Sequence, residues 1–307
     1  MRTWSAAAVL AMVGGVAVTA ACSGPATGPG AGSPRADPSA ASPRPSHPRL
    51  TGADGVSATP VSGPPGVSYA RVRTADGSVI TVVVFHGNLR FVLHNGSQDP
   101  GPAAAALVRA GPTVTGEERR GLLAAFNGGF KLLSRAGGYE QEGHVIRALR
   151  HGLASMVIDR SGRASIGVWG GGVPAPGKAV YSVLQNLWPL VMNGRPAAQT
   201  ARWRRWGGTV GHAAYVARSA VGQTAEGDLM YAASMSTVPA DLASVLVARG
   251  ARIAMELDIN PFWVQLDTAS APGGPLTAGV PGQEHPADQY LVGWTRDCIA
   301  VLDPARS

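Results

Sequence analysis

The sequence predicts an α+β domain with twisted mixed or antiparallel sheets and few helices, forming a single domain after a disordered tether. Three observations predict this class. Short apolar segments, many of them alternating, recur along the chain between Gly, Asn, Asp and Pro turn signals. Only one segment carries a long helical pattern. After residue 65 no second Pro/Gly-rich linker and no internal repeat divides the chain, so we expect one domain.

The first 21 residues have the pattern of an export signal, and we assign residues 1–21 as a signal peptide. Arg2 precedes a small-residue apolar run at 6–18 that is too short to span a bilayer. Thr19-Ala20-Ala21-Cys22 resembles a bacterial lipoprotein box, in which Cys22 is lipidated and becomes the mature N-terminus. We therefore expect an extracytoplasmic protein whose lipid anchors it to the cell membrane. Simple secretion is the alternative.

A composition change separates the N-terminal region from the domain. Residues 22–65 are rich in Pro, Gly, Ser and Ala and nearly lack large apolar residues, so they cannot offset chain entropy and are predicted to be a disordered tether. Residues 66–303 suffice for one sizeable core. The cysteines are Cys22 and Cys298, so with Cys22 lipidated we expect no internal disulfide.

The predicted domain begins with short strands that are joined by turns. Two hairpins are expected, one joining 68–74 to 79–85 and the other joining 154–159 to 164–169. Further strands are expected at 89–94, 122–126, 184–192, 213–221 and 228–234. Short helical turns are expected after Gly101-Pro102 and at 116–120, the second with Thr115 as its cap.

A helix that leads into a strand follows these elements. Ser236 or Thr237 can cap the helix, Pro239 suits its first turn, and Gly250 suits its end. The strand then runs from Arg252 to the residue before Pro261, which lacks a backbone donor.

Polar side chains follow one face of this strand. Because strand side chains alternate, Glu256, Asp258 and Asn260 are expected on one face, opposite Met255 and Leu257. A solvated strand face would explain such acids. The neighbouring apolar segments favour an interior strand, where buried acids need a cation, a metal or a substrate. The strand is therefore our first candidate for an active-site edge.

Two further segments have residues that suit an anionic ligand. Asn127-Gly128-Gly129 follows a buried run, and its glycines allow backbone N–H groups to turn toward one point. An ordinary turn is the alternative, since Asn-Gly is a common hairpin signal. Arg218 lies in an apolar alternating run, where its guanidinium needs a carboxylate or phosphate partner. Pairing with Glu256 or Asp258 is its structural alternative.

Several classes of function find no support in the sequence. The net charge of +7 comes mostly from arginine, but no basic stripe alternates with aromatic residues, so we expect no nucleic-acid partner. The segment most like such a stripe is the cluster of Arg and Trp residues at 202–206, which is typical of a surface loop or a phosphate contact. No zinc-like spacing and no G-x-S-x-G motif occurs. We expect no cofactor and no metal site, with Ca²⁺ on Asp and Asn oxygens as the alternative.

Four blocks of the sequence, by their order and spacing, resemble the phosphodiester glycosidase family, in the form found in actinobacterial-type lipoproteins. These blocks are Leu123–Phe130, Arg218–Gly222, Glu226–Tyr231 and Met255–Asp258. The resemblance runs from about Leu93 to the C-terminus. It departs from the family pattern after Asp258, where Ile259-Asn260-Pro261 replaces the usual glycines and serine.

This resemblance implies a hydrolase that cleaves the glycosidic bond of sugar-1-phosphodiesters, here in cell-envelope glycopolymers. Asp258 would face the anomeric carbon as nucleophile or base, and Glu256 would be its acid/base partner or would set its pKa. Asn260 would bond a sugar hydroxyl. The groups implied at the phosphate are Arg218 and the amides of Asn127, Gly128 and Gly129. The spacing of the two carboxylates leaves retention or inversion open.

Two other functions stay open at this point. A surface lipoprotein could bind anionic glycopolymers through the same residues without turnover. A phosphodiesterase could instead cut the P–O bond. Trp188 and Trp263 are candidates to stack on a sugar, although burial in a core is the more usual fate of tryptophan.

Overall fold

The structure, a computed structural model, describes residues 57–61, 63–64, 66–208 and 210–307. All of them belong to the second of two units into which the chain divides, Pro48–Ser307. The expected signal peptide, the lipidation site Cys22 and residues 22–56 of the expected tether lie outside the described residues. Strand β1 (Ser57–Val61) pairs with β2 (Val67–Arg73), so a strand occupies the last part of the range where the sequence predicts a tether.

Eight strands form the largest sheet, and each neighbouring pair in it is antiparallel. Their spatial order is β1, β2, β3 (Val79–Phe85), β14 (Leu229–Thr237), β13 (Val216–Thr224), β15 (Ala251–Glu256), β11 (Pro189–Met192) and β12 (Arg195–Pro196). The strand that bears Glu256 is therefore an interior strand, as its sequence predicts.

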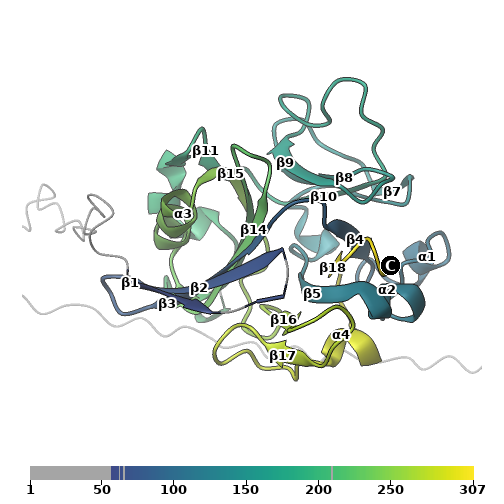
Figure 1. Cartoon of the computed structure of the whole chain (residues 1–307). Helices are drawn as coiled ribbons and strands as arrows, with labels where there is room; N and C mark the ends of the chain where they lie inside the picture. Colours follow the sequence, from purple (N-terminus) through teal and green to yellow (C-terminus); the bar gives the residue numbers. More distant parts are fainter. Residues whose placement is uncertain (1–56, 62, 65, 209) are drawn as a thin grey trace, which may run out of the picture. The chain divides into compact units, whose positions relative to one another are not determined.

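Two five-stranded antiparallel sheets complete the strand framework (Figure 1). One has the order β7 (His144–Arg147), β6 (Tyr139–Gln141), β10 (Ser182–Gln185), β8 (Ala154–Ile158) and β9 (Ala164–Val168). The other has the order β17 (Leu276–Ala278), β16 (Leu266–Ala269), β5 (Leu122–Asn127), β18 (Cys298–Leu302) and β4 (Arg90–His94).

Helices are few and short in the described residues. They are α1 (Pro102–Ala105), α2 (Gly116–Gly121), α3 (Pro239–Ala248) and α4 (Gln289–Val292), with 3₁₀ turns η2 (Leu132–Ser134), η3 (Ala198–Ala201), η4 (Trp203–Arg205) and η5 (Val210–His212). Within these residues, no helix has the length and apolar character needed to cross a membrane. Mostly antiparallel sheets with few helices confirm the predicted α+β class.

The largest apolar cluster contains side chains from all three sheets. Phe85, Phe126, Leu184 and Met255 all belong to it. A second cluster lies on the other face of the large sheet, where α3 covers β14 and β15 (Figure 1). Strand β3 contributes to both clusters because its side chains alternate, with Val82 and Val84 toward α3. The large sheet is thus covered on both faces, which explains why its interior strands are so apolar.

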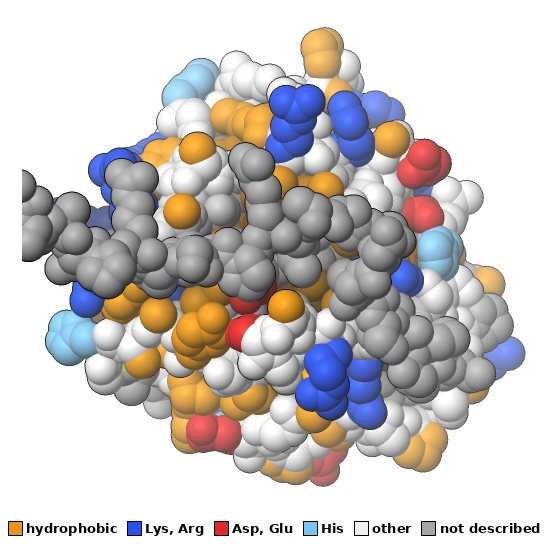
Figure 2. Space-filling view, turned by 90° about the vertical axis from the view of Figure 1, so that its left-hand side faces the viewer, with side chains coloured by type: hydrophobic (Ala, Val, Ile, Leu, Met, Phe, Trp, Pro, Cys, Tyr) orange, Lys and Arg blue, Asp and Glu red, His pale blue; other side chains and the backbone are white. Residues whose placement is uncertain are grey.

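On the face shown in Figure 2, Lys and Arg side chains occur in separate groups among hydrophobic and uncharged atoms.

The predicted hairpins of β2–β3 and β8–β9 are present in the structure. The single strand expected at 184–192 is interrupted, because Leu187 has φ 51° and the chain turns between β10 and β11. The α3 cap is also different: Val238 is its N-cap residue, and no side chain caps it.

The strand predicted to continue through Asp258 ends at Glu256. The carbonyl of Ser219 accepts from the Leu257 N–H, whereas the Ser219 N–H donates to the carbonyl of Asp258. Leu257 and Asp258 therefore both lie opposite Ser219. This is the arrangement of a β-bulge, and it breaks the alternation of side chains along the strand. Asn186 stabilises this turn, because its Nδ2 donates to the carbonyls of Glu256 and Leu257, each at 2.8 Å. Glu256 and Asp258 consequently do not share a face.

Candidate active site

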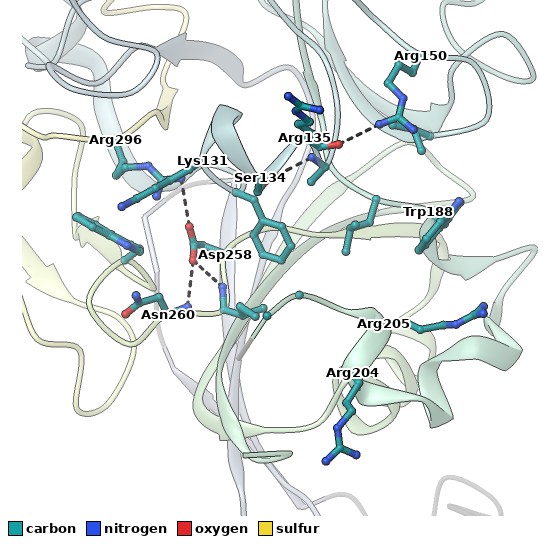
Figure 3. Close-up of a pocket in the computed structure, with 18 residues that line it drawn as sticks. Lys131, Ser134, Arg135, Arg150, Trp188, Arg204, Arg205, Asp258, Asn260 and Arg296 are labelled. Atoms are coloured by element: carbon teal, nitrogen blue, oxygen red, sulfur yellow. Dashed lines mark hydrogen bonds and ion pairs between the residues drawn. The ribbon is translucent and has the colours of Figure 1, made fainter. Parts of the chain in front are cut away.

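A pocket of about 550 Å³ opens where β15 ends (Figure 3). Its wall combines the segment after β5 with η2, the turn between β10 and β11, the loop around η4, and the chain after β15. Pockets of this volume are typical of sites for small organic ligands. Of the residues predicted as functional, Asp258 and Asn260 line it.

Asp258 is the acidic residue of this wall, and its carboxylate is held from two sides. Its Oδ1 accepts from the backbone N–H groups of Ile259 at 2.7 Å and Asn260 at 3.0 Å. Its Oδ2 lies 3.3 Å from Nη2 of Arg296. Burial raises the pKa of Asp258, while Arg296, these two N–H bonds and Lys131 oppose the increase. Arg296 and the two backbone N–H groups therefore offset part of the cost of burying this carboxyl group.

Arg296 is a cation that the sequence analysis missed. It is 3% exposed, lines the pocket, and donates from Nη2 to the carbonyl of Gly129 at 2.7 Å. Its Nε lies 3.4 Å from Asp99, and its guanidinium lies over the Trp263 ring at 5.3 Å from the centroid. Because it contacts the Asp258 carboxylate as well, one buried arginine links three segments at the base of the pocket.

The backbone N–H groups of the two glycines after β5 both bond Asp297 in this structure, one at its backbone carbonyl and the other at its carboxylate. The N–H of Gly128 donates to the carbonyl of Asp297 at 2.9 Å, and the N–H of Gly129 donates to its Oδ2 at 3.2 Å. Asp297 is buried, and burial raises its pKa to about 7. Of these two N–H groups, that of Gly129 alone bonds a carboxylate, that of Asp297, and neither glycine lines the pocket.

Asn127 is fully occupied by protein partners. Its Nδ2 donates to the Gly128 carbonyl and to Oγ of Ser219, at 2.8 and 2.9 Å. Its Oδ1 accepts from the Tyr231 hydroxyl and from the backbone N–H of Gln265. Asn127 does not line the pocket.

The Ser219 hydroxyl in turn contacts the backbone of Asp258. Asn127 therefore positions the Asp258 backbone through Ser219. Asn127 itself is not among the residues that line the pocket.

Arg218 and Glu256 form a fully buried ion pair beside the pocket. Nη1 of Arg218 lies 2.7 Å from Oε1 of Glu256 and also donates to the Trp206 carbonyl. Burial raises the pKa of Glu256, and Arg218 opposes that increase. Neither side chain lines the pocket, and the Arg218 guanidinium pairs with Glu256. The structure thus places these two residues together, and apart from the pocket-lining carboxylate of Asp258.

Asn260 and two tryptophans complete the pocket wall. Oδ1 of Asn260 accepts from the N–H of Phe262, which leaves its amide nitrogen as the group available to a ligand. Trp263 lines the pocket between Arg296 and Lys131, whose Nζ lies 5.6 Å from the ring centroid. Trp188 also lines it and is 44% exposed.

Positive charge dominates the pocket wall. Its basic residues are Lys131, Arg135, Arg150, Arg204, Arg205 and Arg296, against Asp258 as the acid. Such an excess favours an anionic ligand. Among the described residues, no three His, Cys, Asp or Glu side chains are grouped so that they could hold a metal ion.

Arg296 and Asp297, which the sequence analysis missed, occupy a sequence position that is typical of site residues. Arg296 and Asp297 directly precede the apolar strand β18, just as Asp258 follows β15. Polar residues at the ends of buried strands are common site residues, but nothing in the local sequence indicates that β18 lies next to β5.

No family model matches the sequence, and no curated protein matches it. Among solved structures, the chain is similar to the zebrafish N-acetylglucosamine-1-phosphodiester alpha-N-acetylglucosaminidase catalytic domain auto-inhibited by its pro-peptide. This similarity has 13% identity and a TM-score of 0.49, and it covers 81% of this chain and 88% of that one.

A hypothetical protein from Synechocystis is also similar, at 13% identity and a TM-score of 0.47, over 81% of this chain and 64% of that chain. Similarity this low supports no inference about activity or substrate.

Proposed function

We propose that this chain hydrolyses the glycosidic bond of sugar-1-phosphodiesters, with envelope glycopolymers as the substrate class and Asp258 as the reacting carboxylate. The observation that carries the proposal is the single acid of a strongly basic pocket: Asp258, held in place by Arg296 and two backbone N–H groups. The sequence blocks that resemble phosphodiester glycosidases support the same reaction.

A single pocket carboxylate suits this reaction because of its leaving group. Glycosidases that expel an alcohol generally need a second carboxyl group to protonate it. A phosphate monoester leaves with its negative charge already stabilised, and nearby cations can replace the general acid. Lys131, which lies beside Asp258 in Figure 3, and Arg296 supply such cations.

In the proposed reaction the bond between the anomeric carbon and the phosphodiester oxygen breaks. The electron pair leaves with the phosphate monoester, which Lys131 stabilises. In one route Asp258 attacks the anomeric carbon, and water then hydrolyses the resulting glycosyl ester and releases the Asp258 carboxyl group. In the other route Asp258 removes a proton from a water that attacks the anomeric carbon. Water supplies the new anomeric hydroxyl in both routes. Asn260 would donate from Nδ2 to a sugar hydroxyl.

The Arg218–Glu256 pair and the Asn127–Gly129 segment take supporting roles in this proposal. Arg218 neutralises Glu256 beneath the pocket, while Asn127 positions the Asp258 backbone through Ser219. In this proposal the cations that face the substrate are side chains. Lipid anchoring at Cys22, or secretion, would bring the enzyme to an extracytoplasmic polymer.

A binding protein without turnover is the second candidate, and one observation favours it. Glu256, the expected partner carboxylate, is not in the pocket, so the basic wall could simply retain an anionic glycopolymer.

Asp258→Asn distinguishes the two functions. We expect this variant to lose sugar release from sugar-1-phosphodiesters by about a thousandfold or more, because the reacting carboxylate is gone. It should bind the same compounds at least as tightly, since it removes the negative charge of the pocket. Sugar release followed by chromatography and binding followed by calorimetry measure the two effects.

Glu226→Gln is the matched control, because it removes a carboxylate from an exposed turn outside the pocket. Wild-type protein that binds a panel of sugar-1-phosphodiesters but never releases sugar would establish the binding function instead. Incorporation of heavy oxygen from labelled water into the phosphate product would show P–O cleavage and contradict the proposed bond.

A further inference from the structure

The basic side chains of the pocket fall into two groups. In Figure 3, Arg296 and Lys131 lie beside Asp258, whereas Arg135 and Arg150 lie above Trp188 and Arg204 and Arg205 lie below it, away from Asp258. We call these four arginines the outer arginines. The inner group already accounts for one phosphodiester, so the outer group requires a separate explanation.

The outer arginines lack the acidic partners that surface arginines commonly have. All four are exposed, and within the described part of the chain no ion pair joins any of them to a carboxylate. Cations that line one pocket favour an anion within it. Arg296, by contrast, is buried and pairs with Asp99 and Asp258.

The local structure holds this wall in place. The Arg204 guanidinium lies over the Trp203 ring at 4.2 Å from the centroid, and Arg150 donates to the carbonyl of Arg135 at 2.9 Å. Arg135 has φ 58° and Leu187, next to Trp188, has φ 51°. Left-handed backbone at residues other than glycine is costly and is found preferentially at functional positions.

We propose that the outer arginines form a second phosphate subsite, so that the natural substrate carries at least two phosphates, as a chain of sugar-phosphate repeats does. The phosphate to be cleaved occupies the inner group, and the next phosphate along the polymer binds the outer arginines. Trp188 stacks on the sugar between them. This inference rests on the proposed function for its substrate, but the anion subsite itself can be tested without catalysis.

The shape of the site favours a polymer over a membrane surface. The outer arginines line a concave pocket that also contains Asp258, and the flat surface of a bilayer could not follow that pocket inward to Asp258. A flexible chain of phosphates can enter such a pocket and reach both groups.

Binding of linear phosphates to the Asp258→Asn protein tests the subsite without turnover. The probes are inorganic phosphate, tripolyphosphate and a longer linear polyphosphate, measured by calorimetry at one salt concentration. We expect Arg204→Gln/Arg205→Gln to weaken binding of the longest probe by about tenfold or more, because charge-assisted bonds are lost. Binding of inorganic phosphate should change less than about threefold, since the inner group is intact.

Arg202→Gln/Arg249→Gln is the matched control, because it removes the same charge from exposed positions outside the pocket. Equal weakening of all probes in both double variants would overturn the subsite in favour of a general charge effect. Loss of binding to anionic phospholipid vesicles, with no change for polyphosphate, would overturn it in favour of a membrane contact.

Activity measurements separate this inference from the proposed function. With wild-type enzyme, a substrate with two phosphates should have a higher kcat/KM than one with a single phosphate, and the outer double variant should abolish the difference. Sugar release with no such difference overturns the subsite alone. If polyphosphate binding depends on the outer arginines but the protein never releases sugar, the phosphate subsite is supported and the proposed hydrolysis is contradicted.

Discussion

Arg296 shows how one side chain can make an acidic site stable in a protein interior. Burial raises the pKa of Asp297, and the nearby carboxylates of Asp99 and Asp258 raise it further. Arg296 contacts all three, at distances from 3.3 to 4.0 Å. A buried carboxylate that loses such a partner carries the cost of an uncompensated charge. Arg296 therefore offsets part of the cost of burying Asp258 and also holds its carboxyl group in position.

Gly128→Ala tests the close approach between the β5 end and Asp297. A Cβ at this position would lie 2.1 Å from Oδ2 of Asp297, well inside contact distance. We expect the variant to lose about 1–3 kcal/mol of unfolding free energy in urea, because Asp297 must move away from its backbone donors. Gly208→Ala is the control, since a Cβ there meets nothing within 4 Å. Equal stability of the two variants would contradict the tight contact.

At the residue scale, the type of a residue and its place in the sequence were enough to predict a role for some site residues but not for others. The position of Asp258 after a buried strand was enough to select it. Arg218 was equally conspicuous as a charge in an apolar run, and its alternative as the partner of Glu256 is the contact that the structure shows. Local sequence could not reveal that Arg296 would supply the second cation, because that contact joins residues far apart in the chain.

At the element scale, the end of β15 decides the geometry of the site. A regular strand would have placed Glu256 and Asp258 in one row, as two carboxylates of a single active-site face. The extra residue opposite Ser219 instead separates them, and Glu256 pairs with Arg218 on β13. The strands themselves were predictable from apolar periodicity. The bulge was not, since it depends on hydrogen bonds from Asn186 and Ser219 on other strands or turns.

Arg218→Met tests the ion pair between β13 and β15. The substitution leaves the Glu256 carboxyl buried without its cation, so we expect a loss of about 3–5 kcal/mol in unfolding free energy. Arg218→Met/Glu256→Gln removes both charges and should recover a large part of that loss. Urea denaturation of the two variants measures the difference, and a double variant no more stable than the single one would contradict the pairing.

The same double variant tests whether Glu256 acts in catalysis. If the pair only supports the pocket, sugar release by the folded double variant should fall by less than about tenfold. A loss as large as that of Asp258→Asn would instead give Glu256 the acid/base role that the sequence resemblance implies.

At the scale of the whole molecule, several buried carboxyl groups share one direction of pKa shift. Asp267 on β16 is the simplest, because its oxygens accept from the amides of Gln265 and Gln283 and burial raises its pKa to about 7. An acid whose pKa is raised in the folded state stabilises the fold below its unfolded pKa. That contribution is lost as pH rises through its folded pKa. The domain should therefore be more stable in mild acid than in mild base.

Asp267→Asn should reduce this dependence on pH. In wild type we expect the free energy of unfolding to fall between about pH 4 and about pH 8, and Asp267 should account for roughly 2–4 kcal/mol of the decrease. The asparagine can donate to Oε1 of Gln265, which lacks a partner in the structure, so the variant should fold. Parallel pH profiles of wild type and variant in chemical denaturation would contradict this assignment.

The amide of Asn127 bonds Ser219 and Tyr231 of the large sheet and the backbone before β16, while Asn127 itself ends β5. Those groups meet only after two sheets have docked, so a half-folded intermediate would have no ordered aspartate to offer a substrate. If the proposed hydrolysis is correct, sugar release should accordingly emerge late in refolding, in the same kinetic phase as the last packing of the interior.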